Sequence, residues 1–120
     1  MSATPRESIE SVIGEQLSAV SFVQDYVEFH FDGPVIRALT NPVAVTKQGR
    51  AEFPAGGSRD ALCAFIGRTV DLVDLREHEA LRIGFGAGDA IVVPLDDASY
   101  RGPEALHFQV APTAPLQVYA

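Results

Sequence analysis

Two segments of the chain alternate regularly between apolar and polar residues. The apolar positions are Val27, Phe29 and Phe31 in the first segment and Leu81, Ile83 and Phe85 in the second. Alternation with a period of two is typical of strands that bury one face. Each segment is followed by a glycine-containing turn, Asp32–Pro34 or Gly86–Ala90, and then by another apolar stretch. The pattern therefore predicts a three-strand antiparallel meander in each half of the chain.

Two other segments, Pro5–Gly14 and Ser58–Gly67, place apolar residues at helical spacing. The apolar positions are Ile9, Val12 and Ile13 in the first segment and Leu62, Phe65 and Ile66 in the second. Thr4 and Glu7 have the spacing of a capping box, and Ser58 suits the start of the second helix. Both segments end in glycine, the residue that commonly follows a helix. We therefore expect an amphipathic helix before each meander.

The two halves also resemble each other in part. At an offset of 53 positions, three residues of the first segment recur in the second. They are Arg6, Ile13 and Gly14, which correspond to Arg59, Ile66 and Gly67. A further hairpin is expected after each meander, because "VAVT" and "RAEF" flank one turn and "ALHFQV" and "LQVY" flank another. We interpret the match as a duplication. It predicts a single domain over 1–120, built from two repeats at about 5–53 and 58–119.

The expected fold class is α+β. It consists of a tandem pseudo-twofold repeat of a helix plus an antiparallel three-strand meander. The fold would be rich in sheet, arranged either as a sandwich or as a barrel-like roll.

Charge and composition narrow the classes of partner. The chain has 120 residues, with 16 acidic and 9 basic residues and a net charge of −7. This balance argues against binding to nucleic acid or to an anionic membrane surface, because both need a positive field. The single cysteine, Cys63, rules out an intramolecular disulfide and fits a reducing compartment. With no signal-peptide pattern and no long apolar run, the protein is expected to be cytoplasmic.

A glycine-rich stretch, "GFGAGD" at Gly84–Asp89, resembles a nucleotide-binding loop only superficially. The dinucleotide fingerprint requires a helix after the glycines, so that the phosphate meets the helix N-terminus. Here a strand is expected after the glycines. We interpret this stretch as a strand end followed by a hairpin turn.

The histidines and the cysteine do not form a metal-binding pattern. His30 alternates with phenylalanines and is expected on the polar face of its strand, and His78 is expected in a turn. One cysteine does not suffice for a closed structural zinc site, and Cys63 fits a small core residue. We expect no metal and no cofactor.

The segment Tyr100–Phe108 gathers the candidate site residues. They are Tyr100, Arg101, Glu104 and His107. A carboxylate and an imidazole three residues apart can face the same way and support acid–base chemistry or ligand binding. The alternative is a turn that packs Leu106 and Phe108 into the core and leaves its charges in solvent.

The "YRGPEALHF" segment also carries a resemblance. With the "IVVPL" stretch at Ile91–Leu95, its Gly-Pro-Glu-Ala sequence is similar to that of a family of short uncharacterised bacterial proteins. The resemblance covers about Gly67 to Phe108. It implies a self-contained bacterial domain and brings no activity with it.

Three functions follow as hypotheses. No catalytic motif is present, so we expect a non-catalytic association module that acts as a homodimer, with itself as partner. One alternative is a small-ligand-binding protein or enzyme with a site near Tyr100–His107. The other is an acidic protein of the immunity or antitoxin type, because an acidic surface speeds the capture of a basic target.

Overall fold

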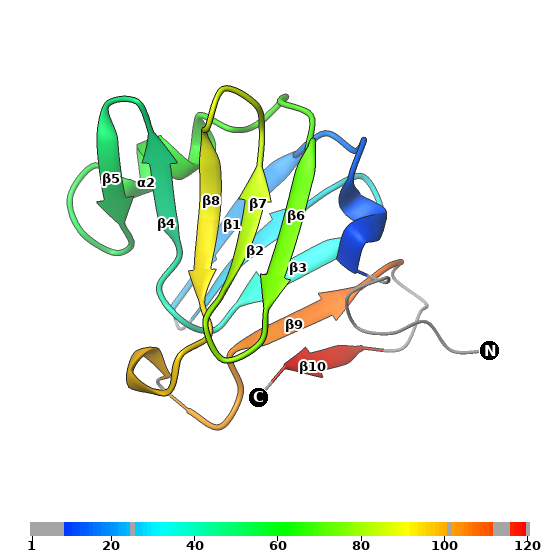
Figure 1. Ribbon diagram of the computed structural model, residues 1–120, viewed down its shortest axis with the longest axis vertical. Coiled ribbons are helices and arrows are strands. Elements are labelled where there is room, and N and C mark those ends of the chain that lie inside the picture. Colours follow the sequence, from blue (N-terminus) through cyan, green and yellow to red (C-terminus); the bar gives the residue numbers. More distant parts are fainter. Residues whose placement is uncertain (1–8, 25, 101, 112–115, 120) are drawn as a thin grey trace.

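The computed structural model describes residues 9–24, 26–100, 102–111 and 116–119, which form two antiparallel sheets of five strands each (Figure 1). The first sheet has the order β1-β2-β3-β9-β10 and the second has the order β5-β4-β8-β7-β6. The strands of the first sheet are β1 (Ala19–Val23), β2 (Tyr26–His30), β3 (Val35–Ala38), β9 (Leu106–Gln109) and β10 (Gln117–Tyr119). Those of the second are β4 (Val43–Thr46), β5 (Gly49–Glu52), β6 (Leu72–Arg76), β7 (Ala80–Gly84) and β8 (Ala90–Pro94).

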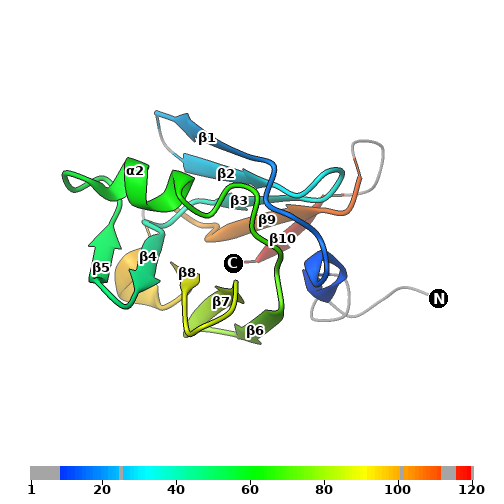
Figure 2. The ribbon, with the colours of Figure 1, turned by 90° about the horizontal axis from the view of Figure 1, so that it is seen from above.

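The two sheets lie face to face and enclose the core, as Figure 2 shows from above. Apolar side chains alternate along each strand, so one face of each sheet packs inward. The buried residues of the first sheet include Val27, Phe29, Ile36, Leu106 and Phe108, and those of the second include Leu75, Leu81, Ile83, Ile91 and Val93. The expected strands and hairpins are confirmed, including the β4–β5 and β9–β10 hairpins.

The chain crosses between the sheets twice. It leaves the first sheet after β3 and returns to it with β9, and the two strands pair antiparallel with Ile36 opposite Phe108. In the same way, β4 pairs with β8 in the second sheet, with Ala44 opposite Ile91. Each sheet is therefore completed by a hairpin from the other half of the chain.

Helical structure is scarce in the described part of the chain. It consists of α2 (Ser58–Cys63) and two 3-10 turns, η1 (Glu10–Val12) and η2 (Asp97–Ser99). The α2 helix contacts β1, β4 and β5, and in Figure 2 it lies between the β1 and β5 edges. None of the described helices has the length and apolar character needed to cross a membrane.

The expected fold class is therefore wrong. The sheets dominate, with a single α-helix among the described residues, and no repeat of a helix plus a meander is visible. Where the first helix was expected, the described part is only η1, and residues 5–8 lie outside the described residues. Ile9 and Val12 are fully buried, so the described end of this segment packs into the core. The second helix was expected over Ser58–Gly67, but α2 ends at Cys63 while Phe65 is still buried. A short helix and the turn after it therefore suffice for this apolar face.

The expected glycines do end both segments. Gly14 and Gly67 have φ angles of +91° and +90°, in the left-handed region that favours glycine. The residues that follow pair with each other through an antiparallel bridge between Gln16 and Thr69. This bridge joins the segment that enters β1 to the segment that enters β6.

Candidate functional site

The structure brings together two of the four residues that the sequence singled out. Glu104 and His107 contact each other through Oε2 and Nε2, with His107 on β9. Tyr100 directly follows η2 and packs against the core. Burial raises the pKa of the Tyr100 phenol, and the nearby carboxylates of Asp97 and Asp96 raise it further. Arg101 lies outside the described residues.

The second ring nitrogen of His107 faces Arg37 on β3. The distance between Arg37 Nη1 and His107 Nδ1 is 3.3 Å. A guanidinium can only donate, so Nδ1 must accept and the proton of a neutral ring lies on Nε2, toward Glu104. This assignment follows from the hydrogen-bond network. His107 therefore links a cation on one side to a carboxylate on the other.

Arg37 is bound more tightly to Glu28 on β2 than to His107. Its Nη2 and Nε atoms donate to Glu28 Oε2 at 2.6 Å and 2.9 Å. The guanidinium also lies 4.9 Å from the centre of the Tyr26 ring, within the range of a cation–π contact. The Arg37 side chain is 32% exposed and the Glu28 side chain 16%, so this ion pair is partly buried.

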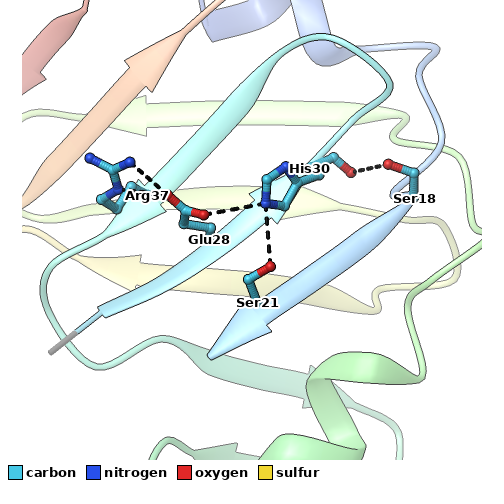
Figure 3. Close-up of polar contacts among 5 residues, drawn as sticks. All are labelled: Ser18, Ser21, Glu28, His30 and Arg37. Atoms are coloured by element: carbon cyan, nitrogen blue, oxygen red, sulfur yellow. Dashed lines mark hydrogen bonds and ion pairs between the residues drawn. The ribbon is translucent and has the colours of Figure 1, made fainter. Parts of the chain in front are cut away.

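The network continues toward the edge of the first sheet, as Figure 3 shows. Glu28 Oε1 lies 3.4 Å from Nε2 of His30, and the same nitrogen lies 3.5 Å from Oγ of Ser21 on β1. The strand register explains this alignment, because Ser21, Glu28, Arg37 and His107 stand directly opposite one another on successive strands. We call Ser21, Glu28, His30, Arg37, Glu104 and His107 the polar row.

The polar row does not have the geometry of a nucleophilic site. In a serine–histidine–carboxylate triad, the carboxylate and the hydroxyl bind opposite nitrogens of the ring. Here Ser21 and Glu28 both contact Nε2 of His30. Each nitrogen of the Arg37 guanidinium already has a partner, so this cation is not free to bind an anion. The polar row instead ties together four strands of the first sheet.

Two surface hollows lie elsewhere, next to the β7–β8 turn. One has a volume of about 260 Å³ and is lined by residues that include Asp71, Arg82 and Gly86, and the other is lined by Lys47 and Asp89 among others. Neither is lined by a residue of the polar row. The glycine-rich stretch forms the end of β7 and the turn, as expected, with φ angles of +90° at Gly86 and +81° at Gly88.

No group of three potential metal ligands occurs among the described residues. His30 lies on the outer face of its strand, as expected, and His78 lies in the β6–β7 turn with a φ of +66°. Cys63 is only half-buried, so it is not the fully enclosed core residue that its neighbours suggested.

The sheet edges differ sharply in charge. The β1 edge, with the sequence AVSFV, has no charged residue and no proline. By contrast, β5 carries Arg50 and Glu52, and β6 carries Asp74 and Arg76. The remaining edge, β10, has only three residues. The longest uncharged edge among the described strands therefore belongs to the first sheet, beside Ser21.

Sequence reasoning found one end of the polar row and missed the rest. The spacing of Glu104 and His107 was visible locally, whereas Arg37, Glu28 and Ser21 join them only through the pairing of separate strands. Their outward positions in alternating segments were the available signal. Comparison of the chain with protein-family models, curated proteins and solved structures gave no match. The resemblance to a bacterial family therefore remains a prediction.

Proposed function

We propose that this protein is a non-catalytic association module, in which two copies pair through the β1 edge. The observation that carries the proposal is that β1 is a five-residue edge strand without a charge or a proline. An edge strand offers a row of unpaired backbone donors and acceptors to another strand. Proteins usually block such edges with lysine, proline or short length. Pairing of two copies would join their first sheets into one continuous sheet.

The other three sheet edges are less suited to strand pairing, which supports the choice of β1. The β5 and β6 edges carry charged residues, and the β10 edge is short. In Figure 2, α2 lies on the side of β1 that faces the second sheet, and no described element lies beyond β1 in the plane of the first sheet. Among the described strands, β1 therefore has a neighbour on one side only.

A second copy is the partner that fits this edge best. Twofold symmetry places the same strand on both sides of the interface, so each residue meets a residue of the same strand. For β1, such pairing opposes no like charges. For β6, pairing about its middle residue would oppose the two Asp74 carboxylates. The single cysteine further fits action in a reducing compartment such as the cytoplasm.

The alternatives receive less support from the described residues. A ligand site near Tyr100–His107 would need free polar groups, but Glu104 and His107 contact each other and Arg37 is held by Glu28. Capture of a basic target by an immunity-type protein rests on the net charge alone.

The first test is native mass spectrometry combined with size-exclusion chromatography. We expect a dimer for the unmodified protein. Val23→Lys introduces a charge on the β1 edge, at a position that is 39% exposed. It should raise the dimer dissociation constant by about tenfold or more.

The matched control is Leu72→Lys on the β6 edge, where the side chain is 47% exposed. It should leave the dimer intact. Circular dichroism melting of both variants checks that each folds. A monomeric unmodified protein, or equal weakening by the two lysines, would overturn the proposal.

A further inference from the structure

The alternation of β1 limits how two copies of the strand can pair. Residues directly opposite each other in an antiparallel pair point to the same face. In β1, Val20 and Phe22 pack against the core, whereas Ala19, Ser21 and Val23 alternate with them on the outer face. A twofold axis between two residues would oppose an outward residue to an inward one. The axis must therefore pass through a residue.

Only one such position uses the whole strand. An axis at Ser21 pairs all five residues of β1, with Ala19 opposite the second copy's Val23 and Val20 opposite the second copy's Phe22. An axis at Val20 or Phe22 pairs only the three residues centred there. The pairing at Ser21 also brings apolar side chains together on the inner face. Val20 and Phe22 are only partly buried in one copy, so each gains an apolar neighbour.

Resting on the proposed function, we propose that the twofold axis of the dimer passes through Ser21, so that the polar rows of the two copies meet there. The Ser21 hydroxyl has one donor and two acceptor sites. In a single copy its nearest polar side-chain partner is His30 Nε2, at 3.5 Å. When the ring nitrogen donates to Ser21, the hydroxyl proton remains available for the second copy's Ser21. The second copy thus completes the hydrogen bonding of this residue.

Continuity of the polar row follows from the same register. Within one copy, the row runs from Glu104 through His107, Arg37 and Glu28 to the edge strand. Joining two rows at Ser21 places a carboxylate–imidazole–guanidinium chain on each side of the axis. The partner is therefore a second copy in one defined register, rather than any exposed strand.

The test is disulfide cross-linking of cysteine variants in a Cys63→Ala background. Opposite residues in an antiparallel pair have Cα atoms about 4.5–5.5 Å apart, which is within disulfide range. Ser21→Cys should therefore give a covalent dimer under mild oxidation with glutathione disulfide, and dithiothreitol should reverse it. Most of the protein should be cross-linked on a non-reducing gel.

Two control variants define the register. With the axis at Ser21, the two copies of residue 23 are offset by four positions, roughly 13 Å, so Val23→Cys alone should not cross-link. The double variant Ala19→Cys/Val23→Cys should cross-link, because its cysteines oppose each other in the dimer. Native mass spectrometry of the Cys63→Ala background reports the subunit count independently of any disulfide.

The outcomes separate the two proposals. A dimeric background in which Val23→Cys cross-links and Ser21→Cys does not would overturn the register while leaving pairing of two copies in place. A monomeric background would overturn both. Cross-linking of Ser21→Cys and of the double variant, without Val23→Cys, supports the axis at Ser21.

Discussion

Arg37 is the residue on which the polar row depends. Its guanidinium binds Glu28 and faces both His107 and the Tyr26 ring. The Glu28 side chain is 16% exposed, so removal of the cation leaves a poorly hydrated carboxylate without its main partner. Loss of a partner at such a site costs more than loss of a partner at the open surface.

We therefore expect Arg37→Met to lower the free energy of unfolding by about 1–2 kcal/mol, a value reduced for the partial exposure of the pair. The control is Arg76→Met. Arg76 pairs with Asp74 at 3.1 Å, but the two side chains are 67% and 34% exposed. Its removal should cost less than about 0.5 kcal/mol. Urea unfolding at neutral pH measures both values, and equal losses would contradict the role assigned to Arg37.

Tyr100 makes stability depend on pH in the alkaline range. Burial and the nearby Asp97 and Asp96 raise the pKa of the phenol above its ordinary value of 10.0. The folded protein then holds this proton more tightly than the unfolded chain does. The contribution of the neutral phenol is fully present below the unfolded-state pKa and is lost as pH rises through the folded-state pKa.

Tyr100→Phe has no proton to lose at this position. Its free energy of unfolding should decline less than that of the unmodified protein between about pH 9 and about pH 11. Chemical unfolding at a series of pH values in this range provides the comparison. Parallel declines in the two proteins would show that Tyr100 does not titrate in the way described.

At the scale of the element, β7 depends on a glycine where it passes β6. Gly84 is buried and stands opposite Leu72. A Cβ atom at Gly84 would lie 2.9 Å from Leu72 Cβ and 3.2 Å from Asp71 Oδ1. The two strands would have to move apart to admit a methyl group.

Gly84→Ala should therefore cost about 1–3 kcal/mol of unfolding free energy, in the range of overpacked sites. Gly56→Ala is the matched control, because a Cβ atom at Gly56 would have no neighbour within 4 Å and its φ lies outside the left-handed region. That substitution should be neutral or slightly stabilising. Thermal or urea unfolding of both variants gives the answer, and a neutral Gly84→Ala would show that the strands yield easily.

Strands were predictable from the sequence because alternation extends over whole segments, as in Val27–Phe31 and Leu81–Phe85. The second helix was overestimated, because α2 ends at Cys63 and the turn after it is enough to bury Phe65. Alternation identifies the face of a residue but not the neighbouring strand. The contact between Arg37 and His107 depends on the β3–β9 pairing and was therefore out of reach.

At the scale of the whole molecule, the proposed interface depends on which strands are edges. The absence of charge in β1 could be read from the sequence, but its place at the end of the first sheet could not. Hydrophobic pattern alone does not distinguish an edge strand from a central one. The order of strands is decided by connections between residues far apart in the chain, which local patterns do not record.

The two crossings between the sheets also affect the order in which strands can pair while the chain is being synthesised. During synthesis the N-terminal strands emerge first, yet the neighbour of β3 is β9, near the other end of the chain. One side of the β3 backbone therefore stays unpaired until β9 has left the ribosome, because Arg37 on β3 and His107 on β9 are 70 residues apart in the chain. Pairings between distant residues form slowly, because long loops must close before the contacts are gained. The nascent chain thus carries a temporary open edge that the finished protein has closed.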